Sequence, residues 1–462
     1  KGEGIVVQGV SLSDPRLPDA IQQLISIDEI RLECSTNLTK LASGIPQISA
    51  VYIRRPIVSA ACRDDGTWTT EDLFVNRNPS RIIPMTIENG ELKLKDARIN
   101  QQFFIREVDL RIDPSDKEAG WALIDGSLSG EFFTRAAIRG RFAPGSQHFD
   151  VSGSVTAFSC SERFTALLPK IHSLPQETCD VVAGLRGNID LNWQARGSLK
   201  DLAQTEFECH GEFDSGHFQT SKLPFDVTDM KAAFYADEKG FTVKSLEAHG
   251  GSTLLRGSGV VFGWSMSSDF QFLLEAERLM LGRQWESFLP TEAAEHWRKL
   301  LPAGEVDVRA ELTRSEGIIE PRVSVRCRNL SLTHYRFPQR LDRTVGTVVL
   351  EGKSLSLYLT GQAGGQPVQV SGAFQLDSSG SVGHVEVRGE AMRISNSLLA
   401  AMPPRSADIV RKLRASGTFD FLFRHERAPH LKDKKSNSLG IRLTDCSMAY
   451  AGFPYPLTKV SG

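Results

Sequence analysis

Residues 305–312 read EVDVRAEL, and this run decides the fold class of the chain. Apolar and polar residues alternate through it, and Gly304 comes directly before it. Successive side chains of a β-strand point to opposite faces, so a period of two places Val306 and Val308 on one face and Asp307 on the other. The run therefore predicts a strand with one apolar face and one polar face.

The stretch around this strand occurs three times along the chain. Each copy carries a proline near a helical pattern, a glycine before a further strand pattern and a second proline further on. The first prolines are at 169, 290 and 403, the glycines at 187, 304 and 417, and the later prolines at 224, 338 and 454. All three markers keep a period of about 115 residues, which indicates an internal repeat.

A direct overlay of two copies keeps both spacing and face. Residues 325–332 (VRCRNLSL) fall on residues 441–448 (IRLTDCSM) at an offset of 116, and Phe337-Pro338 falls on Phe453-Pro454. Apolar residues meet apolar ones at nearly every step, as expected of strands that keep one register. The alternative is a chance similarity between two β-rich segments.

The repeat suggests four parts in the 462 residues. We expect an N-terminal β-meander over residues 1–157, a first repeat over 158–275, a second over 276–388 and a truncated third over 389–462. Because the third copy stops early, we expect the chain to be an excerpt of a longer protein. Each repeat is expected to open with a short helical pair broken by its proline. Near the N-terminus, Asp64-Asp65-Gly66 predicts a hairpin turn.

Composition narrows the class of protein. Apolar residues make up 40% and charged residues 24% of the chain, as in a folded protein rather than a disordered one. The net charge of −2 gives no electrostatic case for binding nucleic acid. Seven cysteines stand singly with no C-x-x-C pair, so most are predicted to be small buried residues, although the spacing also allows a bridge between Cys160 and Cys179.

A series of one-faced strands poses a physical problem. About 25 strands at roughly 4.8 Å each would give a sheet on the order of 120 Å in extent. Its bare apolar face would exceed by several-fold the few hundred Å² that a soluble protein normally exposes. The sheet can curl and bury its own face, or it can curl into a groove filled by apolar ligand. Acyl chains would suit such a groove, at about 0.8 kcal/mol per buried CH₂.

The fold expected is therefore mainly β: an elongated, twisted antiparallel sheet curled into a hydrophobic groove, with short helical pairs at each repeat. Candidates to line the groove are the apolar members of the alternating runs. Three of them, Phe419, Phe421 and Phe423, are equally well explained as core residues that pack against the preceding helical pair. The candidates are Ile189, Leu191, Trp193, Val306, Val308, Leu355, Leu357, Leu359, Phe419, Phe421 and Phe423.

One pattern of strands and glycines resembles a known family. Residues 213–261 contain a strand that ends in Gly250-Gly251 and a following strand with a single Gly257, and Gly364-Gly365 with Gly372 repeats this order. The pattern is similar to that of the AsmA-like family, which includes TamB and YhdP relatives, within the bridge-like lipid transfer superfamily. The resemblance implies a β-sheet groove in the periplasm, anchored in the inner membrane by a segment not present in this chain. It also implies phospholipid as ligand, and proteins of the inner and outer membranes as partners.

Signatures of catalysis are absent from the sequence. There is no H-E-x-x-H, no nucleophile elbow, no Walker loop and no dinucleotide fingerprint that opens a helix. We therefore expect a protein that is not an enzyme and that uses no cofactor or metal. Two functions remain open: transport of phospholipid between membranes of a bacterial envelope, and a structural or outer-membrane assembly role in which no lipid is conducted.

Overall fold

The computed structural model describes residues 4–15, 22–34, 48–62, 68–70, 82–96, 101–165, 183–220, 223–265, 267–289, 291–335, 337–376, 381–428, 435–450 and 455–462. Strands make up 73% and helices 9% of the structure, so the chain is mainly β as the sequence predicts. The strands belong to one open, twisted and mainly antiparallel sheet with a few short helices. The chain forms two compact units, residues 1–218 with 229–244 and residues 219–228 with 245–462.

The first unit pairs its strands in chain order from β1 to β10. One short helix, α2 (Glu162–Thr165), follows β8. The strands are β1 (Gly4–Ser13), β2 (Gln23–Cys34), β3 (Ile48–Cys62), β4 (Met85–Asp96), β5 (Gln101–Pro114), β6 (Ala122–Gly130), β7 (Phe133–Ala143), β8 (His148–Ser159), β9 (Leu185–Ser198), β10 (Asp201–Phe218) and most of β11 (Val227–Asp237).

The second unit continues the pattern after β12 (Gly240–Gly250), whose residues are shared between the units. Its strands pair antiparallel in chain order, β13 with β14 through to β22 with β23. They are β13 (Thr253–Phe262), β14 (Asp269–Leu281), β15 (Ala303–Ser315), β16 (Ile318–His334), β17 (Phe337–Glu351), β18 (Ser354–Ala363), β19 (Gln366–Gln375), β20 (Val382–Arg393), β21 (Ser416–Arg427), β22 (Ser436–Met448) and β23 (Leu457–Val460).

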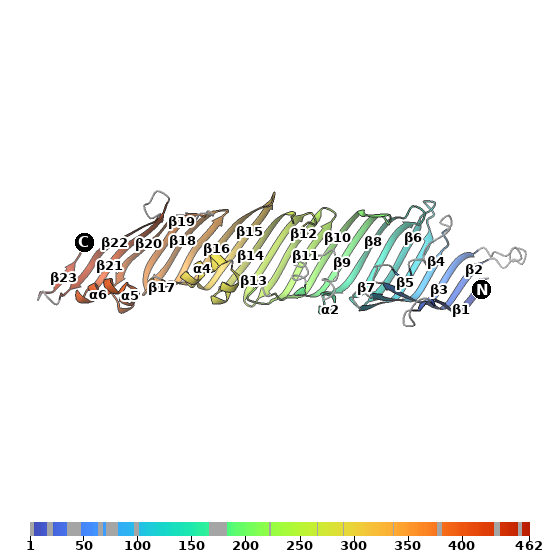
Figure 1. Ribbon diagram of the computed structural model, residues 1–462, viewed down its shortest axis with the longest axis horizontal. Coiled ribbons are helices and arrows are strands. Elements are labelled where there is room, and N and C mark those ends of the chain that lie inside the picture. The colour runs from blue at the N-terminus through green and yellow to red at the C-terminus, as the bar shows by residue number, and fades with distance from the viewer. Residues whose placement is uncertain are drawn as a thin grey trace, which may run out of the picture. The chain divides into compact units, whose positions relative to one another are not determined.

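Four helical segments of the second unit occur in two pairs. The 3₁₀-helix η4 (Arg283–Phe288) and α4 (Thr291–Leu300) join β14 to β15, and α5 (Asn396–Ala401) and α6 (Pro404–Lys412) join β20 to β21. The two joins are six strands apart in an antiparallel series, so both lie at the same edge of this unit, where Figure 1 shows the helices. These pairs agree with the helical pairs expected for the second and third repeats.

Among the strand pairs described above, one departs from the antiparallel pattern. β3 and β4 run parallel, with Ile53 opposite Ile87. The predicted turn at residues 64–66 lies outside the described residues. Beyond it, Trp68 makes only an isolated antiparallel bridge to Cys62, and the backbone N–H of Thr69 donates to the Ala61 oxygen at 2.9 Å. Within the described residues, β4 is the next strand to pair with β3.

Carboxylate-capped bulges recur along the chain. The strand register shifts at Ala157, Arg278 and Ala391, each of which has a positive φ of 50–59°. The backbone N–H of each donates to an aspartate on the next strand, at 2.7, 3.0 and 2.9 Å. The bulges are 121 and 113 residues apart, the same steps as the first marker prolines. The aspartates that accept are Asp190, Asp307 and Asp420.

Three residues before each of these aspartates stands a marker glycine. Gly187, Gly304 and Gly417 have φ values of 139, 131 and 118°, in a region that residues with a Cβ rarely enter. Bulges and glycine kinks both increase the local twist and bend of a strand. The repeated G-x-x-D unit therefore marks the position in each repeat where a glycine kink and a capped bulge occur together, and where a stronger local twist is expected. The marker prolines Pro169, Pro290 and Pro454 lie outside the described residues.

Alternate residues of neighbouring strands face each other in continuous rows. In the second unit we define row A as nine directly paired positions and row B as the seven next positions on the same face. Row B lies two residues from row A, or three on β14, where the bulge intervenes. Row C is the six positions beyond row B. Row A is Leu279, Val306, Cys327, Gly346, Leu359, Val370, Val387, Phe423 and Leu439; row B is Ala276, Val308, Val325, Val348, Leu357, Gly372 and Val385; row C is Leu274, Ala310, Val323, Leu350, Leu355 and Phe374.

Most of the cysteines are buried, as predicted. Five of the six in the described part of the chain are buried, and Cys209 is half-buried. Burial raises the pKa of the Cys160 and Cys327 thiols, which keeps them protonated and unreactive. Cys179, the partner that spacing allows for Cys160, lies outside the described residues.

Candidate functional site

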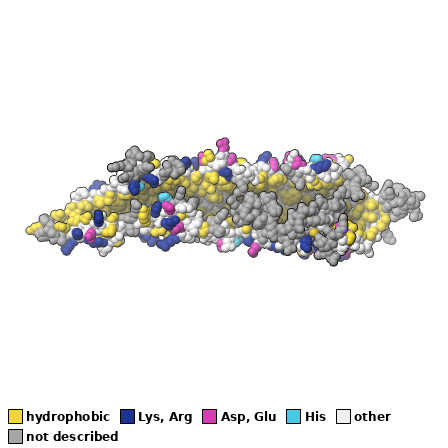
Figure 2. Space-filling view, in the orientation of Figure 1, with side chains coloured by type: hydrophobic (Ala, Val, Ile, Leu, Met, Phe, Trp, Pro, Cys, Tyr) yellow, Lys and Arg dark blue, Asp and Glu magenta, His cyan; other side chains and the backbone are white. Residues whose placement is uncertain are grey.

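The candidate site is the apolar face that rows A, B and C form in the second unit. In the described strands β14 to β20, no position of these rows carries a charged side chain. Figure 2 shows hydrophobic side chains gathered in a recessed band, with charged side chains along its margins. Such a surface can take up hydrocarbon.

All eight second-unit candidates lie on this face. Val306 and Leu359 are in row A, Val308 and Leu357 in row B, and Leu355 in row C, while Phe419, Phe421 and Phe423 follow one another on the same face of β21. Val306 and Leu359 are only 0% and 5% exposed, and the other six are half-buried.

The three first-unit candidates lie together on β9. Ile189, Leu191 and Trp193 are half-buried and alternate with exposed polar residues. Trp193 belongs to a row of directly paired residues that crosses ten strands of the first unit. That row is Val7, Ile30, Ile53, Ile87, Leu110, Gly126, Ile138, Gly153, Trp193 and Cys209.

Aromatic rings on both units lie across glycines of the neighbouring strand. A Cβ on Gly389 would overlap the ring of Phe421, and one on Gly153 would overlap the ring of Trp193. A ring in this position covers the exposed backbone of the glycine. The ring of Phe421 therefore lies close to the sheet surface at Gly389. The rings of Phe419 and Phe421 are tilted at 41° with centroids 6.4 Å apart.

Sequence reasoning missed a cover over part of row A. Leu279, Val306, Cys327, Leu330 and Leu359 form a buried cluster, against which Trp285 of η4 and Phe225 pack. The rings of Trp285 and Phe225 meet edge to face with centroids 6.1 Å apart, and the indole N–H donates to the Met280 oxygen at 3.0 Å. The helical spacing of Trp285 predicts that it is buried, but not which strands it covers.

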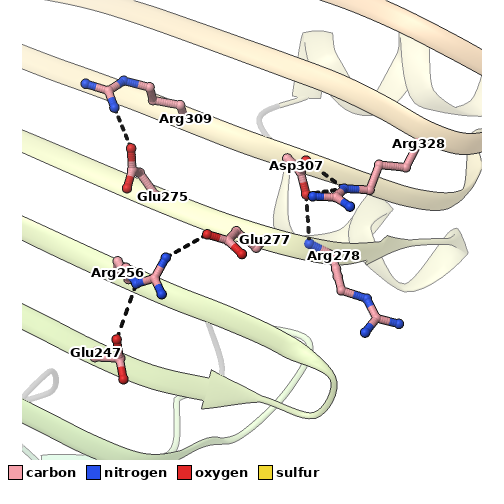
Figure 3. A network of polar contacts seen from close by, with 8 residues as sticks. All are labelled: Glu247, Arg256, Glu275, Glu277, Arg278, Asp307, Arg309 and Arg328. Atoms are coloured by element: carbon pink, nitrogen blue, oxygen red, sulfur yellow. Dashed lines mark hydrogen bonds and ion pairs between the residues drawn. The ribbon is translucent and has the colours of Figure 1, made fainter.

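The opposite face of the second unit is charged and largely paired within itself. Arg256 bridges Glu247 and Glu277 at 3.3 and 2.6 Å, and Arg309 pairs with Glu275 (Figure 3). These groups are 33–55% exposed, so each pair contributes little stability. Their effect is to keep this face hydrated, which leaves the apolar face as the surface available to a nonpolar ligand.

Asp307 differs from these exposed carboxylates because it holds a bulge. It accepts from the backbone N–H of Arg278 at 3.0 Å and from the Arg328 guanidinium at 2.7 and 2.8 Å (Figure 3). Burial by itself would raise the pKa of Asp307, but the hydrogen bonds from Arg328 and from Arg278 outweigh it, so the pKa lies below its ordinary value of 3.8.

Asp307→Asn is expected to lower the free energy of unfolding by about 1–2 kcal/mol at neutral pH, because the charge-assisted bonds are lost. The folded pKa is the lower one, so the carboxylate stabilises the fold above about pH 4 and this contribution disappears as the pH falls through the folded pKa. Urea unfolding near pH 7 and near pH 3 measures it. An equal deficit of the variant at both pH values would contradict the assignment. Asp342→Asn, in an exposed pair with Arg340, is the control and should cost about 0.5 kcal/mol or less.

Within the described ranges, no group of three or more His, Cys, Asp or Glu side chains could hold a metal ion. In the same ranges no helix is both long and apolar enough to cross a bilayer. No protein-family model matches the chain, and no curated protein matches its sequence.

Proposed function

We propose that this chain is an AsmA-like, non-enzymatic protein that carries phospholipid along its apolar face, between the inner and outer membranes of a bacterial envelope. The acyl chains lie on rows A, B and C and the headgroup projects to solvent. In this proposal the chain works in the periplasm, together with proteins of both membranes, and a segment outside this chain anchors it to the inner membrane.

The observation that carries the proposal is the exposure of large apolar side chains on the face itself. Leu274 in row C is 44% exposed, Leu439 in row A is 61% exposed and Ile441, on the same face of β22, is 55% exposed. If side chains of the protein itself filled the concave face, they would cover these residues. Each CH₂ of an acyl chain that they cover contributes about 0.8 kcal/mol, so one chain of ordinary length supplies several kcal/mol.

Purified protein is expected to retain phospholipid, identified by mass spectrometry of an organic extract. The matched control is incubation with glycerophosphocholine, which has the headgroup but no acyl chains and should not be retained. Protein that holds no lipid after purification, and takes none from phosphatidylcholine vesicles, would contradict the proposal.

One observation favours the alternative, a structural or assembly factor that conducts no lipid. The cluster under Trp285 is closed by the protein itself, with Val306 0% exposed. If the whole face behaved in this way, vesicle lipid would bind nowhere on it. The two functions therefore give opposite results in the extraction experiment.

A further inference from the structure

Part of row A is closed, whereas other parts of the same apolar face are open. Leu279, Val306 and Cys327 are 8%, 0% and 3% exposed, whereas Leu439 at the far end of the row is 61% exposed. On the same strands rows B and C stay partly open, since Val308 and Leu357 are half-buried and Leu274 is 44% exposed. The apolar face is thus narrowed, not blocked, across β14 to β18.

The narrowing is built from two segments that are distant in sequence. Trp285 comes from η4, and Phe225 comes from the corner before β11, where its ring lies over Gly250. Beyond the indole bond to Met280, the cover is fixed by the Trp297 indole N–H, which donates to the Gly282 oxygen at 3.3 Å, and by an ion pair of 2.9 Å between Arg298 and Glu286. The cover is therefore a packed, anchored feature of the second unit.

Equivalent side chains occur in the other two repeats. Phe164 of α2 and Leu398 of α5 each stand seven residues after a capped bulge, as Trp285 does after Arg278. Phe164 packs against Phe132 and Phe158 with centroids 5.7 and 4.9 Å apart, and Leu398 is 7% exposed in a helix that contacts β17. Each repeat thus carries a large apolar side chain seven residues after its bulge, and the side chain packs against other residues of its own unit.

We infer that Trp285, with Phe225, is a constriction that excludes acyl chains from row A at β14 to β18 and confines them to rows B and C. Phe164 and Leu398 are the corresponding positions of the other repeats. The inference rests on the proposed function, because it concerns where on the same face the lipid lies. An acyl chain moving along the face of the second unit would leave row A beneath Trp285 and regain it beyond, so this side chain sets the width of apolar face available to the lipid there.

A photoactivatable phosphatidylcholine with a diazirine in one acyl chain tests this, with labelled residues mapped by mass spectrometry on the full chain. In the unaltered protein, strong label is expected at Leu357 and Leu274 and only weak label at Val306 and Leu359. In Trp285→Ala, label at Val306 and Leu359 should rise about tenfold, the change that about 1.4 kcal/mol of gained apolar contact produces. Phe225→Leu, a milder change, should shift the label in the same direction if Trp285→Ala folds poorly. Trp264→Ala, at a side chain 61% exposed in the β13–β14 turn, is the control and should leave the pattern unchanged.

The outcomes separate the two proposals. Two results would contradict the constriction but not lipid binding. One is label at Val306 equal to that at Leu357 in the unaltered protein. The other is a labelling pattern that does not change in Trp285→Ala and Phe225→Leu when both variants are folded. Absence of label from all three rows would overturn both.

Discussion

Gly304→Ala is expected to destabilise the second unit by at least about 3 kcal/mol, a large part of the stability of an ordinary domain. Gly304 has a φ of 131°, and an added Cβ would overlap the backbone oxygen of Asn329 on β16. In the alanine variant the backbone at residue 304 would be strained, and it cannot relax without breaking the β15–β16 pairing. The Asn329 oxygen belongs to that pairing and cannot move away either. Hydrogen exchange of the β15 and β16 amides in the full chain, together with urea unfolding, measures the effect.

The matched control for this prediction is Gly440→Ala on β22. Gly440 has no positive φ, and the nearest atom to an added Cβ is the Leu422 oxygen at 3.9 Å. Its replacement should change the free energy of unfolding by about 0.5 kcal/mol or less. If the two alanine variants were equally stable, the kink at Gly304 would not be what bends and holds the strand.

Leu357→Asp is expected to reduce lipid binding at least about tenfold, because an acyl chain on row B would have to desolvate the new carboxylate. Tyr358→Asp is the matched control, since the neighbouring side chain points to the opposite face and is 56% exposed. Bound phospholipid per chain, measured after equilibration with vesicles, should fall in the first variant and not in the second.

Phe421→Asp and Leu422→Asp repeat the test on β21, where Phe421 lies on the apolar face and Leu422 on the other. Thermal melts show whether each variant is folded before lipid is counted. Folded Leu357→Asp and Phe421→Asp that carry lipid normally would show that these residues do not line the path.

The strands and their faces could be predicted because the signal is local. The alternation in residues 305–312 places Val306 and Val308 on one face whatever lies beyond. The bulges could have been predicted from the repeated G-x-x-D unit that begins at Gly187, Gly304 and Gly417, since a carboxylate that recurs at one spacing after a glycine has a structural role.

The contacts that close row A depend on residues far apart in sequence. Nothing near Phe225 indicates that it meets Trp285, sixty residues later, and single-sequence periodicity gives burial without a partner. The parallel pairing of β3 with β4 could not be predicted either, because a local sequence pattern does not say which strands pair. The turn chemistry of residues 64–66 concerns only neighbouring residues and gives no information on which strand pairs with β3.

The helical joins of the second unit stand six strands apart, and six is an even number. In an antiparallel series, adding or removing an even number of strands leaves the chain at the same edge of the sheet and running in the same direction. Duplication or deletion of one whole six-strand repeat would therefore leave every remaining helical insert at its present edge. A single added strand would instead move all later inserts to the opposite margin. Growth of such a protein by recombination is therefore confined to whole copies or paired strands, and engineered chimaeras should be joined only at those positions.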